Sequence, residues 1–257
     1  MKEERVVKEQ LRFKARYFQW FPAEKPLGRK EEALELDVSE TAFVLVDAYL
    51  PEKTGETELL SDVEYRLKYS IAVEHIAPAL AAARKALIPV VYVNNSAPNI
   101  CLEKSEFARQ LARAQGFSIA DEFVEETVDP LEYRHGRGQW LHFAPPLRPL
   151  PGDIYIRKHV YSGFYATRLE AALHHMNAKN LIFAGFRIDV CLGSTMLDAL
   201  YRNFKVLLLR DCTLACELPE ELTTRRFTER MLIWFETMIG MSADSKDFIE
   251  ACARVRA

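Results

Sequence analysis

The chain has 257 residues, of which 49% are hydrophobic and 28% charged, and its formal net charge is −3. A chain of this length and composition can bury a sizeable core, and its small net charge gives no sign of nucleic acid or a membrane surface as a partner. No apolar run approaches the roughly 18 residues of a membrane span, the charged residues 1–5 are unlike a signal peptide, and five cysteines suit reduced thiols better than a disulfide framework, so we expect a cytoplasmic protein.

Residues 1–40 form a predicted N-terminal arm that differs in character from the rest. The run from Arg12 to Pro22 is dense in aromatic and basic side chains. Such runs can bind single-stranded nucleic acid by stacking, but the chain is acidic overall and has no second basic patch. Unpacked aromatics in this number would form an exposed apolar patch. We therefore expect the arm to pack on its own domain or on a neighbouring subunit.

Strands and helices alternate through residues 41–257, which we expect to form a single domain. This alternation predicts an α/β fold: a doubly wound, Rossmann-like, six-stranded and mainly parallel sheet with helices on both faces. The predicted strands are 41–46, 88–93, 153–158, 181–185, 204–209 and 238–241. The predicted helices are 63–86, 104–114, 167–176, one that begins at Cys191, and 219–236.

Three chemically reactive side chains stand at the ends of predicted strands. Asp47 follows strand 41–46, Lys158 ends strand 153–158, and Cys191 opens the helix after strand 181–185. Taken singly, Asp47 is typical of a helix cap, Lys158 of a solvated strand end and Cys191 of a small buried side chain. Ligands of open parallel sheets bind outside the carboxyl ends of the strands, however, so the three side chains are predicted to converge.

The position of Cys191 on the first turn of a helix favours a reactive thiol. Unpaired N–H groups and the positive end of the helix dipole stabilise a thiolate, and can lower a cysteine pKa from roughly 8.5 to between about 3.5 and 7.5. The same N–H groups can hold the oxyanion that forms when sulfur attacks a carbonyl. Cys212 and Cys216 lack a second Cys or His pair, so we expect no metal site.

These residues resemble the signature of the isochorismatase-like cysteine hydrolases: an Asp after the first strand, a Lys after a middle strand and a Cys that opens a helix. The resemblance covers residues 40–241 and is strongest in 158–167 and 185–195. Within the family, Tyr161-Ser162-Gly163-Phe164 looks most like ureidoacrylate amidohydrolases, and residues 207–212 are similar to biuret hydrolases.

The resemblance implies a cysteine amidohydrolase that uses no metal or cofactor. Asp47 acts as general base, Lys158 orients it, and Cys191 attacks a small linear amide or ureido substrate to give a thioester and ammonia or an amine. The resemblance also implies that the N–H groups of Ile188 and Cys191 hold the oxyanion. It further implies a homo-oligomer, either a dimer or a tetramer. Four side chains near the expected site are candidate substrate contacts: Asn94, Tyr161, Phe164 and Arg187, the last suited to a carboxylate.

The chain departs from the family pattern at two positions. Tyr49 replaces the common Gln two residues after the Asp, and Ile188 replaces the common Thr three residues before the Cys. The family also implies a cis peptide, which alignment puts between Arg187 and Ile188. Two alternatives remain open: an isochorismatase-type vinyl ether hydrolase, which does not use the cysteine as nucleophile, and a catalytically silent small-molecule-binding member of the family.

Overall fold

A single eight-stranded sheet organises the chain, which the computed structural model describes at residues 9–22, 24–25, 27–50, 62–95, 97–98, 106–115, 133–134, 143 and 145–255. The strands lie in the order β2-β1-β10-β9-β8-β3-β4-β7, and those from β10 to β7 run parallel. Their bounds are β1 Gln10–Gln19, β2 Gly28–Asp37, β3 Thr41–Val46, β4 Val90–Asn95, β7 Ile154–Lys158, β8 Asn180–Gly185, β9 Lys205–Leu209 and β10 Met241–Ala243. A separate pair joins β5 (Ala97–Pro98) to β6 (Tyr133–Arg134).

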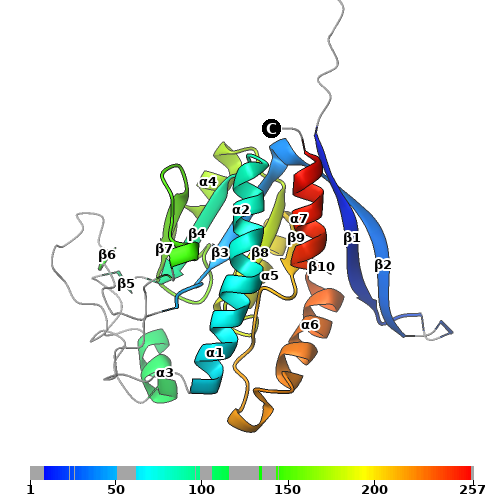
Figure 1. Cartoon of the computed structure of the whole chain (residues 1–257). Coiled ribbons are helices and arrows are strands. Elements are labelled where there is room, and N and C mark those ends of the chain that lie inside the picture. Colours follow the sequence, from blue (N-terminus) through cyan, green and yellow to red (C-terminus); the bar gives the residue numbers. More distant parts are fainter. Residues whose placement is uncertain are drawn as a thin grey trace, which may run out of the picture.

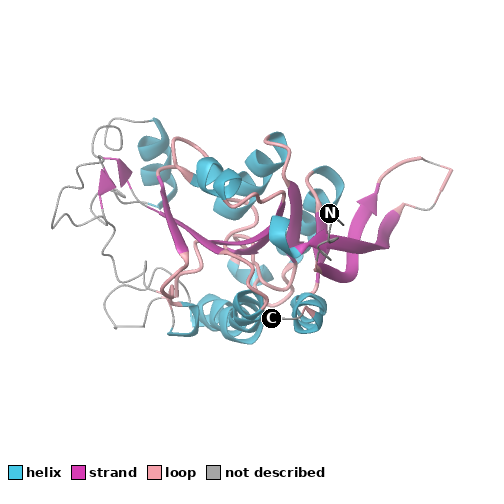
Figure 2. Cartoon of the chain, turned by 90° about the horizontal axis from the view of Figure 1, so that it is seen from above, coloured by secondary structure: helices cyan, strands magenta, loops and turns pink. Residues whose placement is uncertain are grey.

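Helices cover both faces of the sheet, as predicted (Figures 1 and 2). Their bounds are α1 Asp62–Ser70, α2 Ala77–Lys85, α3 Glu106–Gln115, α4 Leu169–His175, α5 Cys191–Tyr201, α6 Arg226–Met238 and α7 Ser245–Arg254. One core cluster joins α2 and α7 to the sheet, and the other joins α4, α5 and α6 to the opposite face. The doubly wound α/β class is confirmed.

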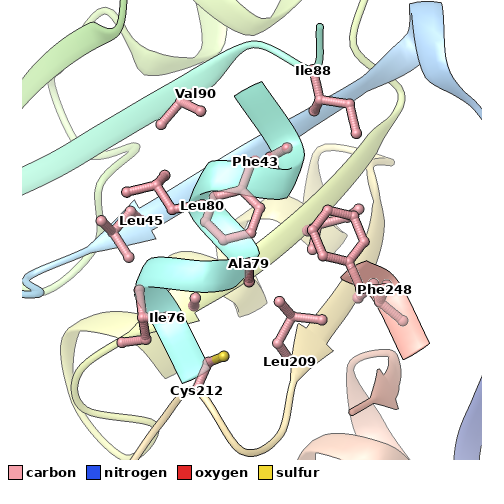
Figure 3. Close-up of a cluster of buried hydrophobic side chains, with 14 of the residues drawn as sticks. Phe43, Leu45, Ile76, Ala79, Leu80, Ile88, Val90, Leu209, Cys212 and Phe248 are labelled. Carbon is pink, nitrogen blue, oxygen red and sulfur yellow. The ribbon is translucent and has the colours of Figure 1, made fainter. Parts of the chain in front are cut away.

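Strand β3 shows why the central strands read as continuous apolar runs. All its residues are buried, with Phe43 and Leu45 in one core cluster and Val44 and Val46 in the other. A strand covered on both faces has no solvated side and needs no polar alternation. Figure 3 shows Phe43 and Leu45 beside Leu80 of α2, with Phe248 of α7 in the same cluster.

The predicted helix 63–86 is one continuous helix with a wider, π-helical turn in its middle. A π-helical turn over Ile71–Ile76 separates α1 from α2, and the N–H of Ala77 bonds to the carbonyl of Ala72. Pro78 stands in the first turn of α2, where its missing N–H costs no helix bond. The π-helical turn therefore allows the helix to continue through Pro78.

Most of the predicted arm is part of the sheet, which explains why the sheet has eight strands and not six. Strands β1 and β2 form a long antiparallel hairpin, and β1 pairs with β10 through Arg16 and Ser242. Leu11 and Ala15 of β1 are buried, and Phe13 meets Phe248 of α7 edge-on. The arm thus packs on its own domain; residues 1–8 lie outside the described residues.

Large aromatic side chains at the tip of the hairpin are exposed to solvent. Trp20 and Phe21 are 52% and 72% exposed. Together with Phe18 they border a hollow of about 760 Å³, whose other wall is α6, with Trp234 and Met238. No helix among the described residues has the length and apolar character needed to cross a membrane.

Two elements near the C-terminus differ from the predicted ones. Helix α6 begins only at Arg226, after a short 3-10 turn, and β10 lies at Met241–Ala243, so it shares only Met241 with the predicted strand 238–241. Helix α7, which the sequence analysis did not predict, follows β10 and covers Phe43 through Phe248.

Candidate active site

The site lies where the strand order reverses, between β3 and β8. From β3 the chain continues outward through β4 and β7, and then returns to β8 on the other side of β3. Ligands of open α/β sheets bind at such a switch point, outside the carboxyl ends of the strands. Asp47 follows β3, Lys158 ends β7, and Cys191 opens α5 after β8. The structure brings these three side chains together.

Lys158 is the centre of the group. Its ammonium is 2.9 Å from Asp47 Oδ2 and 3.2 Å from Cys191 Sγ, and it also donates to Asn95 Oδ1. The side chain is fully buried, and burial acts to lower its pKa. Attraction to Asp47 and Cys191 outweighs this effect, so the pKa of Lys158 is raised and the group stays charged.

The pKa of the Cys191 thiol is shifted in the direction opposite to the one expected from its helix position. Burial raises it, the Asp47 carboxylate raises it further, and Lys158 only partly offsets both. The helix N-terminus is present, but the thiol shares a desolvated space with an anion. The resting group is therefore a thiol beside a carboxylate, with a lysine ammonium in contact with both.

Tyr49 holds the second oxygen of Asp47. Its hydroxyl donates to Asp47 Oδ1 and accepts a hydrogen bond of 2.8 Å from the N–H of Asn95. Burial and the neighbouring carboxylate raise the pKa of Tyr49 well above its ordinary value, which keeps the phenol protonated as a donor. Asp47 is thus fixed from two sides, by Tyr49 and by Lys158.

The loop between β8 and α5 packs closely against the end of β3 and is hydrogen-bonded to the start of α5. Gly185 has φ 118°, and a Cβ there would lie 1.9 Å from the carbonyl oxygen of Val46, so only glycine fits at the end of β8. The carbonyl of Arg187 accepts from the N–H groups of Val190 and Leu192. The cis peptide lies between Phe186 and Arg187, one bond before the position that alignment indicated.

The two expected oxyanion donors have different surroundings. The N–H of Ile188 donates to the carbonyl of Leu214 at 3.2 Å, because this loop is bridged to the segment after β9. It is not free to meet a ligand in this arrangement. The N–H of Cys191, on the first turn of α5, has no acceptor among the described residues.

The Tyr161-Ser162-Gly163-Phe164 run is anchored on α5. Ser162 donates to Asp198, and the N–H of Gly163 donates to Thr195 at 3.0 Å. Phe164 is buried between Phe204 and Arg202, so its side chain belongs to the core. Tyr161 interacts electrostatically with the thiol: burial raises the pKa of Tyr161, and the charge of Cys191 adds to that shift.

Arg187 and Asn94, the other two predicted substrate contacts, have partners within the protein. The guanidinium of Arg187 bonds to Glu64 of α1 and to the carbonyl of Ala215. Asn94 is buried and donates to the hydroxyl of Tyr155 at 2.9 Å. Its carbonyl oxygen is buried without a hydrogen-bond partner among the described residues.

Three side chains of the site were not in the predicted set: Tyr49 as a partner of Asp47, Asn95 as a partner of Lys158, and Lys68. Asn95 was detectable as the last residue of a strand beside the site. Lys68 was detectable because it precedes Ile71, Ala72 and Ile76 at helical spacing, which puts a charge on the buried stripe of its helix. No three Cys, His, Asp or Glu side chains in the described part of the chain are grouped as a metal would require.

Comparison with known proteins agrees with this architecture. The chain is 28% identical over 235 residues to the ureidoacrylate amidohydrolase of Cronobacter sakazakii, a match that covers 88% of this chain and 94% of the relative. It is 30% identical over 204 residues to the ureidoacrylate amidohydrolase of Rhizobium rhizogenes, covering 73% and 75% of the two chains.

Two crystal structures share the fold. A cysteine hydrolase from Pseudomonas syringae superposes with a TM-score of 0.64 at 20% identity, covering 86% of this chain and 96% of that one. The N-carbamoylsarcosine amidase of Thermoplasma acidophilum superposes with a TM-score of 0.52 at 21% identity, covering 80% and 96%. The isochorismatase domain model matches residues 61–231, and the chain therefore belongs to the isochorismatase family.

Proposed function

We propose that this protein is a cysteine amidohydrolase that cleaves a C–N bond of a small linear amide or ureido compound. The observation that carries the proposal is the position of Lys158, whose ammonium contacts both Asp47 and the Cys191 sulfur. A base, a nucleophile and a cation within contact distance are the parts that acyl transfer to sulfur needs. The relatives named as ureidoacrylate amidohydrolases support the same class of reaction.

The first chemical step in this proposal is proton transfer from Cys191 to Asp47. Since the pKa of the thiol is raised, sulfur loses its proton to the carboxylate only as it attacks the substrate carbonyl. Lys158 stays charged and stabilises the sulfur anion. Asp47 then gives the proton to the leaving nitrogen, which departs as ammonia or an amine and leaves a thioester on Cys191.

The second half of the proposed reaction hydrolyses the thioester. Asp47 takes a proton from water, the hydroxide attacks the thioester carbonyl, and the thiol is restored as the acid product leaves. In both halves the carbonyl oxygen becomes negative and requires donors. The N–H of Cys191 has no acceptor among the described residues, which supports this role for it, whereas Ile188 would first have to release the carbonyl of Leu214.

The experiment that tests the function is ammonia release from a panel of small amides and ureido compounds. Cys191→Ala should lower kcat/KM on any accepted substrate by at least about 10³-fold, because the nucleophile is lost. Cys216→Ser is the matched control, since Cys216 is exposed and contacts neither Asp47 nor Lys158 through a hydrogen bond among the described residues. Full activity of Cys191→Ala, or hydrolysis of a vinyl ether alone, would contradict the proposal.

A further inference from the structure

Lys68 of α1 is a buried cation that the proposed reaction does not use. Its side chain is on the inner face of the helix, and the residue is only 8% exposed. The ammonium lies 4.8 Å from the centre of the Phe186 ring, at the start of the loop that leads to Cys191. Among the described residues it has no hydrogen bond and no salt bridge. A charge removed from water in this way is unfavourable unless an anion joins it.

The surroundings of Lys68 connect it to the catalytic group. Burial lowers its pKa to about 8, while the Asp47 carboxylate and Cys216 act to raise it. The N–H of Phe186, over whose ring the ammonium lies, bonds to the carbonyl of Val46, the residue directly before Asp47. Lys68 therefore lies at the same edge of the sheet as Asp47.

The other charges of this neighbourhood are already compensated. Lys158 pairs with Asp47, and Arg187 pairs with Glu64. Asp189 accepts from the N–H of Cys216 and is not among the charges that act on Lys68. Among the described residues, Lys68 is therefore a cation without an ion pair.

We propose that Lys68 binds the carboxylate of the substrate, so that the enzyme acts on small amide or ureido acids in preference to their uncharged analogues. This inference rests on the proposed amidohydrolase function. A single ammonium suits a single carboxylate. The Phe186 ring beside it is buried in the core and holds the ammonium at this place through its face. Arg187, which the sequence indicated for this role, has its guanidinium committed to Glu64.

The first test compares substrates that differ only in charge, for example 3-ureidopropionate and its methyl ester. The full chain should favour the acid, and Lys68→Met should reduce the acid-to-ester ratio of kcat/KM by about tenfold to a hundredfold, the range of a charge-assisted contact. Lys68→Arg should keep most of the preference. Lys205→Met is the control, because Lys205 is exposed at the amino end of β9, opposite the site. An unchanged ratio in Lys68→Met overturns the inference.

The second test separates this inference from the proposed function. Binding of 3-ureidopropionate and of its methyl ester is measured by calorimetry in Cys191→Ala, with and without Lys68→Met. Tighter binding of the acid that is lost with Lys68→Met supports the carboxylate site even if no amide is hydrolysed. Hydrolysis of amides with equal binding of acid and ester leaves the amidohydrolase proposal standing and refutes the role of Lys68. Thermal unfolding of each variant shows that it is folded.

Discussion

At the scale of single residues, the site depends on how Asp47 is held. Its two carboxylate oxygens are engaged by different partners, Tyr49 on Oδ1 and Lys158 on Oδ2. Both contacts fix the position of the carboxylate beside the Cys191 thiol. Tyr49 departs from the family pattern, and in this structure its hydroxyl donates a hydrogen bond to Asp47.

Tyr49→Phe should lower kcat/KM by about tenfold to a hundredfold. The tyrosine hydroxyl holds Asp47 Oδ1, so its loss lets the carboxylate turn away from the Cys191 thiol. The measurement is kcat/KM on one substrate, with thermal unfolding to show that the variant is folded. Tyr155→Phe serves as the control, because that hydroxyl bonds to Asn94 and not to Asp47. Equal values of kcat/KM in the two variants would contradict the role of Tyr49.

Asp47→Asn should abolish turnover and yet make Cys191 more reactive toward iodoacetamide. Burial and the Asp47 carboxylate raise the pKa of the thiol, and Lys158 lowers it, so removing the carboxylate lowers that pKa and increases the thiolate fraction at neutral pH. The amide reaction still fails because no group accepts the thiol proton and returns it to nitrogen. Alkylation rates are compared in a Cys216→Ser background; slower alkylation of Asp47→Asn would show that the carboxylate is not what suppresses the thiolate.

At the scale of elements, the sequence predicted the strands and helices that have a local pattern of apolar residues. The buried strands before Asp47 and Cys191 are short apolar runs because both faces are covered, and their ends mark the edge where the candidate site lies. The convergence of Asp47, Lys158 and Cys191 followed from that pattern and from the family resemblance. The hairpin β1–β2 was missed as a pair of strands because basic and aromatic residues mask its alternation.

Three of the residues predicted for the site have partners that lie far away in the chain. Arg187 is paired with Glu64, and Phe164 is packed against Phe204. The N–H of Ile188 is taken by the carbonyl of Leu214. None of these pairings leaves a local signal such as periodicity or a cap, so a residue near the right strand end can still be committed elsewhere.

Glu236 of α6 fastens the N-terminal hairpin to the body of the protein. Its buried carboxylate accepts from Arg16 of β1, Arg29 of β2 and Ser242 of β10. Since the carboxylate is desolvated and its partners are left unpaired when it is removed, Glu236→Gln should lower the free energy of unfolding by about 3 kcal/mol. Urea denaturation measures this.

Glu229→Gln is the matched control for Glu236. Glu229 lies on the same helix and pairs with the same Arg29 at 2.5 Å, but its side chain is 50% exposed. An exposed ion pair contributes little, so this variant should change stability by less than about 1 kcal/mol. Equal effects of the two substitutions would mean that burial does not decide the strength of the contact.

At the scale of the whole molecule, the apolar hollow between the hairpin tip and α6 relates to assembly. We expect the protein to be a homo-oligomer, a dimer or a tetramer, in which this hollow is covered by a second copy. The double variant Trp20→Ser/Phe21→Ser should then have a lower mass in solution, measured by light scattering. Tyr201→Ser, which removes another exposed aromatic remote from the hollow, should keep the mass of the full chain. The same mass in all three proteins would contradict this role of the hollow.

The hairpin also determines where the sheet stops growing. An open strand edge is a template for further strands, and proteins protect such edges with charge. Without β1 and β2, the short strand β10 would present its unpaired backbone to solvent. In the intact chain the outermost strand on this side is β2, which carries Arg29, Lys30, Glu31 and Glu32 in succession. Detachment of the hairpin would expose β10 as the edge strand in place of the charged strand β2. We therefore expect the segment that completes the sheet also to limit aggregation.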